Sequence, residues 1–189
     1  NELDKHIEEI EIEMAKRCIP YSSYIECMIQ IPGISYMASM AIIAEIGIDM
    51  EQFETDKQLA CWAGLSPANN ESANKKKSVK ISKAGSYIKP LLVQCALAAI
   101  KSNSEPYYRI KYERIKKRRG HKKAIIAIAR MMLVAIYHIL LTGETFNPSD
   151  IEEIHNPKTS KNKTLTVESA LTFLKEQGLD ISSINLVAL

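Results

Sequence analysis

GLSPANNESANKKKSVKISKAG, residues 64–85, is a polar stretch between two sequences with strong helical patterns. It contains four Ser, three Asn and five Lys, and it is the longest segment without helical apolar periodicity before the C-terminal tail. A polar loop of this length inside a compact domain is uncommon, and such loops usually carry function. The rest of the chain is therefore expected to be a scaffold that holds one basic functional loop.

The segments on both sides of this loop predict an all-α fold, a compact helical domain with room for a small hairpin in the loop. No alternation of Val, Ile and Thr is long enough for a sheet. The most apolar run, residues 124–141, is interrupted by Arg130 and His138. Charge at mid-span is costly in a bilayer, so this run predicts a buried core helix of a cytoplasmic protein with no membrane partner.

Before the loop, helices over 22–30 and 35–46 are predicted on either side of an apolar Pro-Gly turn at residues 31–34. This arrangement resembles a helix-hairpin-helix motif, in which a glycine lets backbone N–H groups approach a phosphate. Gly33 and Ser35 are the candidate phosphate contacts. A tight turn between two core helices is the alternative.

The chain divides into four predicted segments: 1–19, 20–148, 149–165 and 166–189. The first carries apolar residues at 4-3-4 spacing, which is typical of the end of a coiled-coil helix or of a helix that packs on its own domain. These residues are Leu3, Ile7, Ile10 and Met14. The second segment is the main domain, the third is a polar linker, and the fourth is an accessory helix with a short apolar end.

Charge is distributed unevenly along the chain. Residues 1–56 contain 3 Lys/Arg and 12 Asp/Glu, a net charge of −9, whereas residues 75–123 contain 16 Lys/Arg and 2 Glu, a net charge of +14. Such asymmetry is the footprint of a polyanion-binding face, with DNA as the expected partner and a solvated basic surface as the alternative.

The candidate nucleic-acid-binding residues lie in the turn, the loop, the start of the helix that follows Gly120, and the basic helix over 105–120, where tyrosines interleave with the cations. They are Gly33, Ser35, Lys75, Lys76, Lys77, Lys80, Ser82, Lys83, Arg109, Arg114, Lys117, Arg118, Arg119 and Lys122, with the hydroxyls of Tyr107, Tyr108 and Tyr112 as further phosphate contacts.

The four cysteines show neither CxxC nor zinc-ligand spacing, and they lie in apolar helical settings. We interpret them as reduced core residues, and no metal site is expected in this chain.

Three short motifs occur in this order: Gly64-Leu65-Ser66-Pro67, Glu71-Ser72 and Ile81-Ser82-Lys83-Ala84-Gly85. Together with the preceding Pro-Gly turn and the basic and apolar helices that follow, they resemble the C-terminal domain of DEDD-type insertion-sequence transposases, called the IS-one-ten or Piv/MooV family. The resemblance covers roughly residues 31–148.

The resemblance implies DNA transposition through a serine nucleophile, which falls on Ser72, with Glu71 as an orienting carboxylate. It also implies a separate N-terminal RNase-H-like domain that holds Mg²⁺, a coiled-coil connection, an oligomeric protein and, as in some members, a bridge RNA that guides target choice. The sequence departs from the family at Ala73, where Gly is usual, and at Asn70, where an aromatic residue is common. Ala restricts the backbone where Gly allows a positive φ.

The residues alone leave the nucleophile open, since Ser66, Ser78 and Ser82 are as plausible as Ser72 without the family. Three functions remain open as well: a catalytic transposase domain, a DNA- or RNA-binding module in which Ser72 is chemically idle, and an oligomerisation domain. The isolated chain is not expected to cleave DNA by itself.

Overall fold

The described part of the chain is helical, as its periodicity predicts. The computed structural model describes residues 2–67, 71–72, 75–76, 80–102 and 105–152, with the backbone alone at 71–72 and 75–76. The helices are α1 (Glu2–Cys18), η1 (Ile19–Tyr21), α2 (Ser22–Met28), α3 (Tyr36–Ile46), η2 (Met50–Gln52), α4 (Asp56–Trp62), α5 (Ile88–Lys101), α6 (Tyr107–Arg119) and α7 (His121–Thr142).

The chain divides into two units, Asn1–Ile151 and Glu152–Leu189. The account below concerns the first unit. The accessory helix predicted after residue 165 lies outside the described residues, as do Lys77, Ser78, Ala73 and Asn70.

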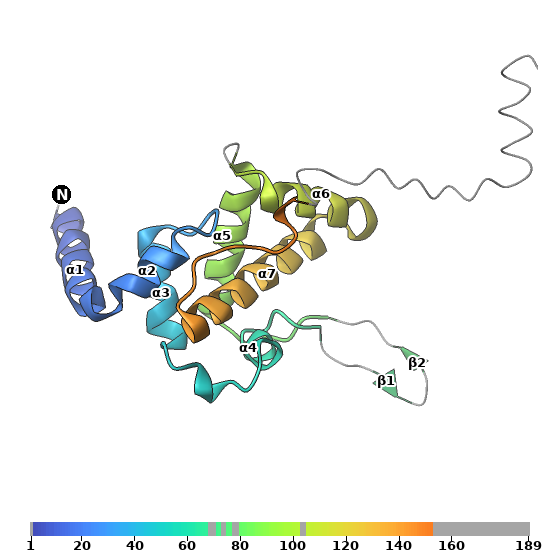
Figure 1. Ribbon diagram of the computed structural model, residues 1–189, viewed down its shortest axis with the longest axis horizontal. Helices are drawn as coiled ribbons and strands as arrows, with labels where there is room; N and C mark the ends of the chain where they lie inside the picture. Colours follow the sequence, from blue (N-terminus) through green and yellow to red (C-terminus); the bar gives the residue numbers. More distant parts are fainter. Residues whose placement is uncertain (1, 68–70, 73–74, 77–79, 103–104, 153–189) are drawn as a thin grey trace, which may run out of the picture. The chain divides into compact units, whose positions relative to one another are not determined.

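Helix α7 is the centre of the domain. It packs against α4, α5 and α6 and lies between α4 on one side and α5 and α6 on the other (Figure 1). Its inward side chains include Ala124, Ile128 and Met132, which are fully buried. Among the described residues α7 alone is long and apolar enough to cross a membrane, but 56% of its most apolar window is buried against the other helices. Burial of this apolar surface is the main driving force for packing the helices around it.

Local sequence signals begin and end several of these helices. The Thr55 hydroxyl accepts a hydrogen bond from the backbone N–H of Gln58 at 3.2 Å, which caps α4. The side chain of Gln58 returns the bond to the backbone N–H of Glu54 instead of Thr55. Gly143 ends α7 in the left-handed conformation.

The turn between α2 and α3 packs tightly on α5. Gly33 has a φ of +90°, and a Cβ placed there would lie 2.4 Å from the carbonyl oxygen of Cys95 and 2.7 Å from the Cβ of Ala99. After the turn, the Ser35 hydroxyl caps α3 by accepting a hydrogen bond from the backbone N–H of Ala38 at 3.1 Å. Both residues therefore have a structural task, and their phosphate contacts stay a prediction.

Replacement of Gly33 by Ala is expected to destabilise the domain by about 3 kcal/mol, because it adds a clash with the α5 backbone to the strain of a positive φ. The control is Gly120→Ala. Gly120 also has a positive φ, +81°, but a Cβ there meets nothing within 4 Å, so a loss of about 1 kcal/mol is expected. Denaturant unfolding of the two variants measures the difference. Equal losses would mean that contact with α5 is not what requires the glycine.

Helix α1 contains no buried residue. The three apolar side chains Leu3, Ile7 and Ile10 are 68%, 54% and 60% exposed, whereas Met14 is half-buried. Packing of the apolar seam on its own domain, one of the two alternatives for this segment, is therefore limited to its last turn.

Candidate nucleic-acid interface and serine hairpin

The polar loop contains a small antiparallel hairpin. Strands β1 (Glu71–Ser72) and β2 (Lys75–Lys76) pair so that Ser72 lies opposite Lys75 and Glu71 opposite Lys76. The loop had room for such a hairpin, but the sequence did not fix its register. The register brings the backbone of the candidate nucleophile beside that of a lysine.

Two glycines bring the ends of the loop together at its base. A Cβ on Gly64 would lie 2.4 Å from the carbonyl oxygen of Ala84, and a Cβ on Gly85 would lie 2.2 Å from that of Ala63. Both glycines have a positive φ, +66° and +68°. Because no side chain separates the two backbones, they cross in direct contact, and each glycine is required for that contact.

Beyond this crossing, Pro67 and Ile81 form an isolated antiparallel bridge. The candidate residues Lys80, Ser82 and Lys83 lie on either side of Ile81 and are exposed. The Ser82 hydroxyl accepts a hydrogen bond from the backbone N–H of Ala84 at 3.3 Å. Lys80 and Lys83 are thus exposed next to the glycine crossing at which the loop begins and ends.

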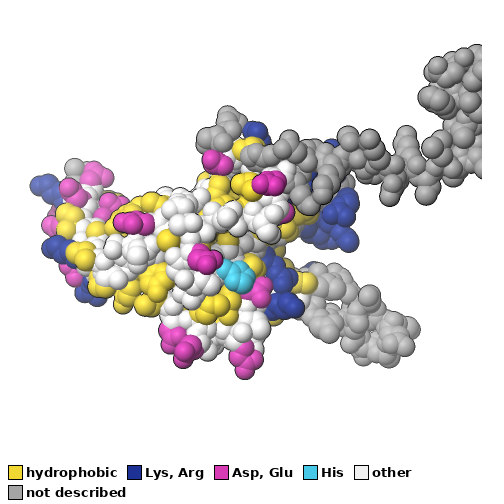
Figure 2. Space-filling view, in the orientation of Figure 1, with side chains coloured by type: hydrophobic (Ala, Val, Ile, Leu, Met, Phe, Trp, Pro, Cys, Tyr) yellow, Lys and Arg dark blue, Asp and Glu magenta, His cyan; other side chains and the backbone are white. Residues whose placement is uncertain are grey.

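A second basic surface lies where α6 meets α7. The α6–α7 basic corner consists of exposed residues: Arg114, Lys116, Lys117, Arg118, Arg119, Lys122 and Lys123. Glu113 is the acidic residue within this stretch, and it lies 3.5 Å from the Nζ of Lys116. Figure 2 shows Lys and Arg side chains gathered at this end of the molecule. Such a cluster of exposed cations is suited to a polyanion.

The first half of α6 does not join this surface. Tyr107, Tyr108 and Tyr112 are buried, with at most 6% of each exposed, so the expected contact of their hydroxyls with phosphates is wrong. The apolar rings of these tyrosines pack into the core between α6 and α7. Arg109, another candidate of this half, is half-buried.

Tyr112 reaches across the α6–α7 junction. Its hydroxyl lies 2.8 Å from Nδ1 of His121, the first residue of α7. This bond ties the two helices together beside the basic corner, and it gives His121 a structural partner within the chain.

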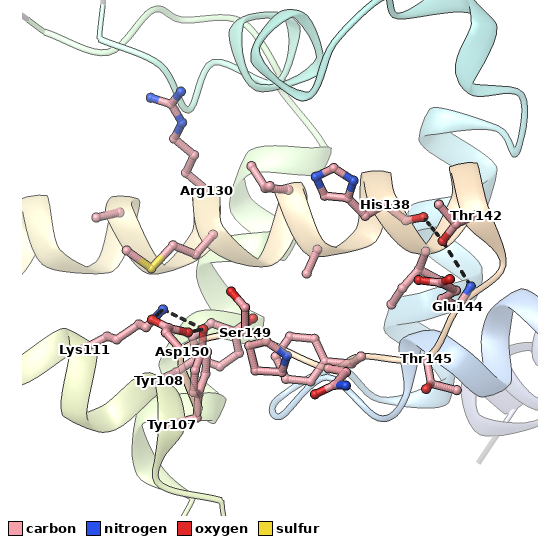
Figure 3. Close-up of a pocket in the computed structure, with 18 residues that line it drawn as sticks. Tyr107, Tyr108, Lys111, Arg130, His138, Thr142, Glu144, Thr145, Ser149 and Asp150 are labelled. Carbon is pink, nitrogen blue, oxygen red and sulfur yellow. Dashed lines mark hydrogen bonds and ion pairs between the residues drawn. The ribbon is translucent and has the colours of Figure 1, made fainter. Parts of the chain in front are cut away.

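A cavity of about 600 Å³ lies between α6, α7 and the segment that follows α7. At one end Asp150 accepts a hydrogen bond from the Tyr107 hydroxyl at 2.8 Å and pairs with the Lys111 ammonium at 2.7 Å (Figure 3). Arg130 and His138 also line the cavity, and their side chains point away from the Asp150 cluster. The sequence offered no signal for this cluster, because Asp150 lies 43 residues after Tyr107.

The Asp150 cluster holds the segment after α7 onto α6. Although burial alone would raise it, the pKa of Asp150 is lowered by the hydrogen bonds from Lys111 and Tyr107 and by the Lys111 charge. Burial is also the main cause that raises the pKa of Tyr107, followed by its bond to Asp150. The segment is thus fixed by an ionised carboxylate.

We expect Asp150→Asn to lower the free energy of unfolding by about 1 kcal/mol at pH 7, since it removes a partly exposed ion pair. A carboxyl whose pKa is lowered by folding stabilises the fold at pH values above its unfolded pKa, and this contribution is lost as the pH falls through the folded pKa. The difference between wild type and variant should therefore vanish in acid. Denaturant titrations at pH 7 and pH 3 measure it, and a difference that persists unchanged at pH 3 would contradict the role of the charge.

Comparison with known proteins gives a consistent picture. Residues 25–113 match the model of a family described as Transposase IS116/IS110/IS902 family. The chain is 30% identical over 119 residues to the transposase for insertion sequence element IS1111A of Coxiella burnetii, which covers 61% of this chain and 32% of that protein. It is 32% identical over 78 residues to a probable family 20 transposase of Pseudomonas aeruginosa, covering 41% of this chain and 23% of the relative.

The chain thus spans a third or less of the length of these two relatives. Over the matched residues the chain is similar to transposases of the IS116/IS110/IS902 group, in agreement with the resemblance seen in its motifs. The hairpin, its glycine base, α5 and the first half of α6 all lie within the matched residues.

Proposed function

We propose that this chain is the DNA-handling part of a transposase of that family, and that it cuts and rejoins DNA through Ser72. The observation that carries the proposal is the family match over residues 25–113, which includes the hairpin with Ser72. The activity, the substrate and the partners of the whole protein all form part of the proposal.

In the proposed reaction the Ser72 hydroxyl attacks the phosphorus of a DNA phosphodiester. A bond forms between Oγ and phosphorus, the bond from phosphorus to one sugar oxygen breaks, and that oxygen leaves with a proton. The product is a phosphoserine link to DNA, and its reversal with another strand end rejoins the DNA. Lys75 and Lys76, together with Lys80 and Lys83, supply cations for the charge that develops on the phosphate oxygens.

The serine requires help from outside this chain. The proposed partner is an RNase-H-like domain whose Mg²⁺ would activate the nucleophile or polarise the phosphate. Within the described residues no group of three or more His, Cys, Asp or Glu could hold a metal ion. Glu71, beside the serine in β1, is proposed to orient the attacking group.

The protein is proposed to act as an oligomer. Two copies of α1 could bury the exposed side chains of Leu3, Ile7 and Ile10 against each other, as heptad seams do. A bridge RNA is a further proposed partner, since the α6–α7 basic corner suits an RNA backbone as well as a DNA backbone.

A binding module without chemistry is the second candidate function. It is favoured by the α6–α7 basic corner, which is exposed and independent of Ser72. Replacement of the family's usual Gly by Ala73 beside the serine also favours it. In this alternative the chain holds nucleic acid while another part of the protein cuts it.

A covalent-adduct assay separates the two functions. The longer protein that carries this segment is incubated with labelled DNA from the ends of its element, and the mixture is run on a denaturing gel. A labelled protein band that requires Ser72 supports the nucleophile. Tight binding without such a band supports the binding module.

A further inference from the structure

Lys89 lies in the first turn of α5, at the base of the serine hairpin. Its Nζ donates hydrogen bonds to the backbone carbonyls of Ser82 at 2.8 Å and Ala84 at 2.6 Å. A cation in the first turn of a helix opposes the helix dipole, so its place there does not serve the stability of α5. The two carbonyls are the partners that compensate for this position.

The ammonium group of Lys89 also sits against the glycine crossing. A Cβ on Gly64 would lie 2.8 Å from this Nζ and 2.4 Å from the carbonyl oxygen of Ala84. The side chain thus joins three parts of the chain: the start of α5, residues 82–84 near the end of the loop, and Gly64, at which the loop begins. Since Gly85 contacts Ala63 directly, the crossing has little freedom to shift.

The contacts of Lys89 hold residues 82–84, near the end of the loop, in place. Residues 82–84 carry the two accepting carbonyls, and Ile81 forms the bridge with Pro67 immediately before them. Without the ammonium group, two carbonyls that converge on one point would lose their shared donor and would turn toward water. The bridge and the strands beyond it would then be aimed less accurately.

We propose that Lys89 is a positioning residue that aims the β1–β2 hairpin, and with it Ser72, at the DNA phosphate. The inference rests on the proposed function for the role of Ser72, but the clamp itself is defined by described residues. Lys89 acts through the backbone of residues 82–84 and does not contact the substrate. It therefore differs from Lys80 and Lys83, whose ammonium groups are exposed and available to phosphates.

The test compares Lys89→Met with Lys101→Met in the longer protein that carries this segment. Lys101 is an exposed lysine at the other end of α5, so the control removes the same charge from the same helix. At saturating DNA, Lys89→Met is expected to form the covalent adduct about 10- to 100-fold more slowly, because small misplacements of a nucleophile have effects of this size. The dissociation constant and its salt dependence should stay those of wild type, and Lys101→Met should match wild type throughout.

The second variant is Lys89→Arg, whose side chain still has several N–H groups that can donate to the two carbonyls. It should recover most of the rate of adduct formation that Lys89→Met loses. A rate equal to wild type in Lys89→Met would overturn the proposal. The proposal would also be overturned if Lys89→Met had a larger dissociation constant for DNA, a slope of log K against log salt reduced by about 1, and an unchanged rate at saturation. That result would identify Lys89 as a phosphate contact.

Backbone hydrogen exchange provides a readout that does not depend on Ser72. In the 189-residue chain, residues 80–87 should exchange faster in Lys89→Met than in wild type, whereas Lys101→Met should leave them unchanged. If wild type forms no adduct, the serine chemistry fails and exchange alone decides the clamp. Equal exchange in Lys89→Met and wild type would then overturn it.

Discussion

Replacement of Ser72 by Ala is expected to abolish the covalent protein–DNA adduct, with a loss of roughly 10⁴-fold or more, as for other enzymes that lose their nucleophile. The oxygen that would form the bond to phosphorus is absent in the variant. Binding of DNA should change by no more than about twofold, because most of the affinity of such proteins comes from cations on phosphates. The measurement is a denaturing gel with labelled DNA, accompanied by a binding titration.

The matched control is Ser66→Ala, a serine at the base of the same loop. Ser66 was as plausible a nucleophile as Ser72 from the residues alone, and it is half-buried next to the glycine crossing. It should retain the adduct. If Ser66→Ala loses the adduct and Ser72→Ala keeps it, the nucleophile is at the base of the loop instead of in the hairpin. If both variants keep it, the attacking group is elsewhere in the protein.

The sequence was sufficient for the helical fold because its signals are local. The Thr55 cap, the Gly143 stop and the apolar run that became α7 each depend on residues within one or two helical turns. A helix that is apolar on most of its surface has to be buried, so the central place of α7 followed from composition. What the sequence could not supply is which partner each helix finds.

In the candidate site, too, local features could be predicted from the sequence and contacts between distant segments could not. Exposed Lys and Arg at the end of α6 could be predicted, since a run of charges has nowhere to be buried. The burial of Tyr107, Tyr108 and Tyr112 could not, because it depends on α6 packing against α7 and on the returning segment with Asp150. The sequence did not single out Lys89 among the cations of residues 75–123, because its two bonds to loop carbonyls require a chain crossing that no local pattern reveals.

The basic corner is expected to supply much of the affinity for nucleic acid. Replacement of Lys117, Arg118, Arg119 and Lys122 by Gln should weaken DNA binding by roughly 10²- to 10³-fold near physiological salt and should reduce the slope of log K against log salt by roughly 3 to 4. Each side chain that neutralises a phosphate releases about one counterion, so the change in slope counts the lost contacts. Binding titrations at several salt concentrations measure both quantities.

The control removes four other exposed cations, Lys5, Lys16, Lys57 and Lys101, also by Gln. The net charge of the chain changes by the same amount in both variants, so a general charge effect would weaken binding equally. We expect the control to keep the wild-type slope, because only cations that lie against phosphates release counterions on binding. Equal slopes in the two variants would mean that the corner is a solvated surface. In that case the exposed loop lysines Lys80 and Lys83 would have to carry the DNA contact, and removal of both should then lower the slope by about 2.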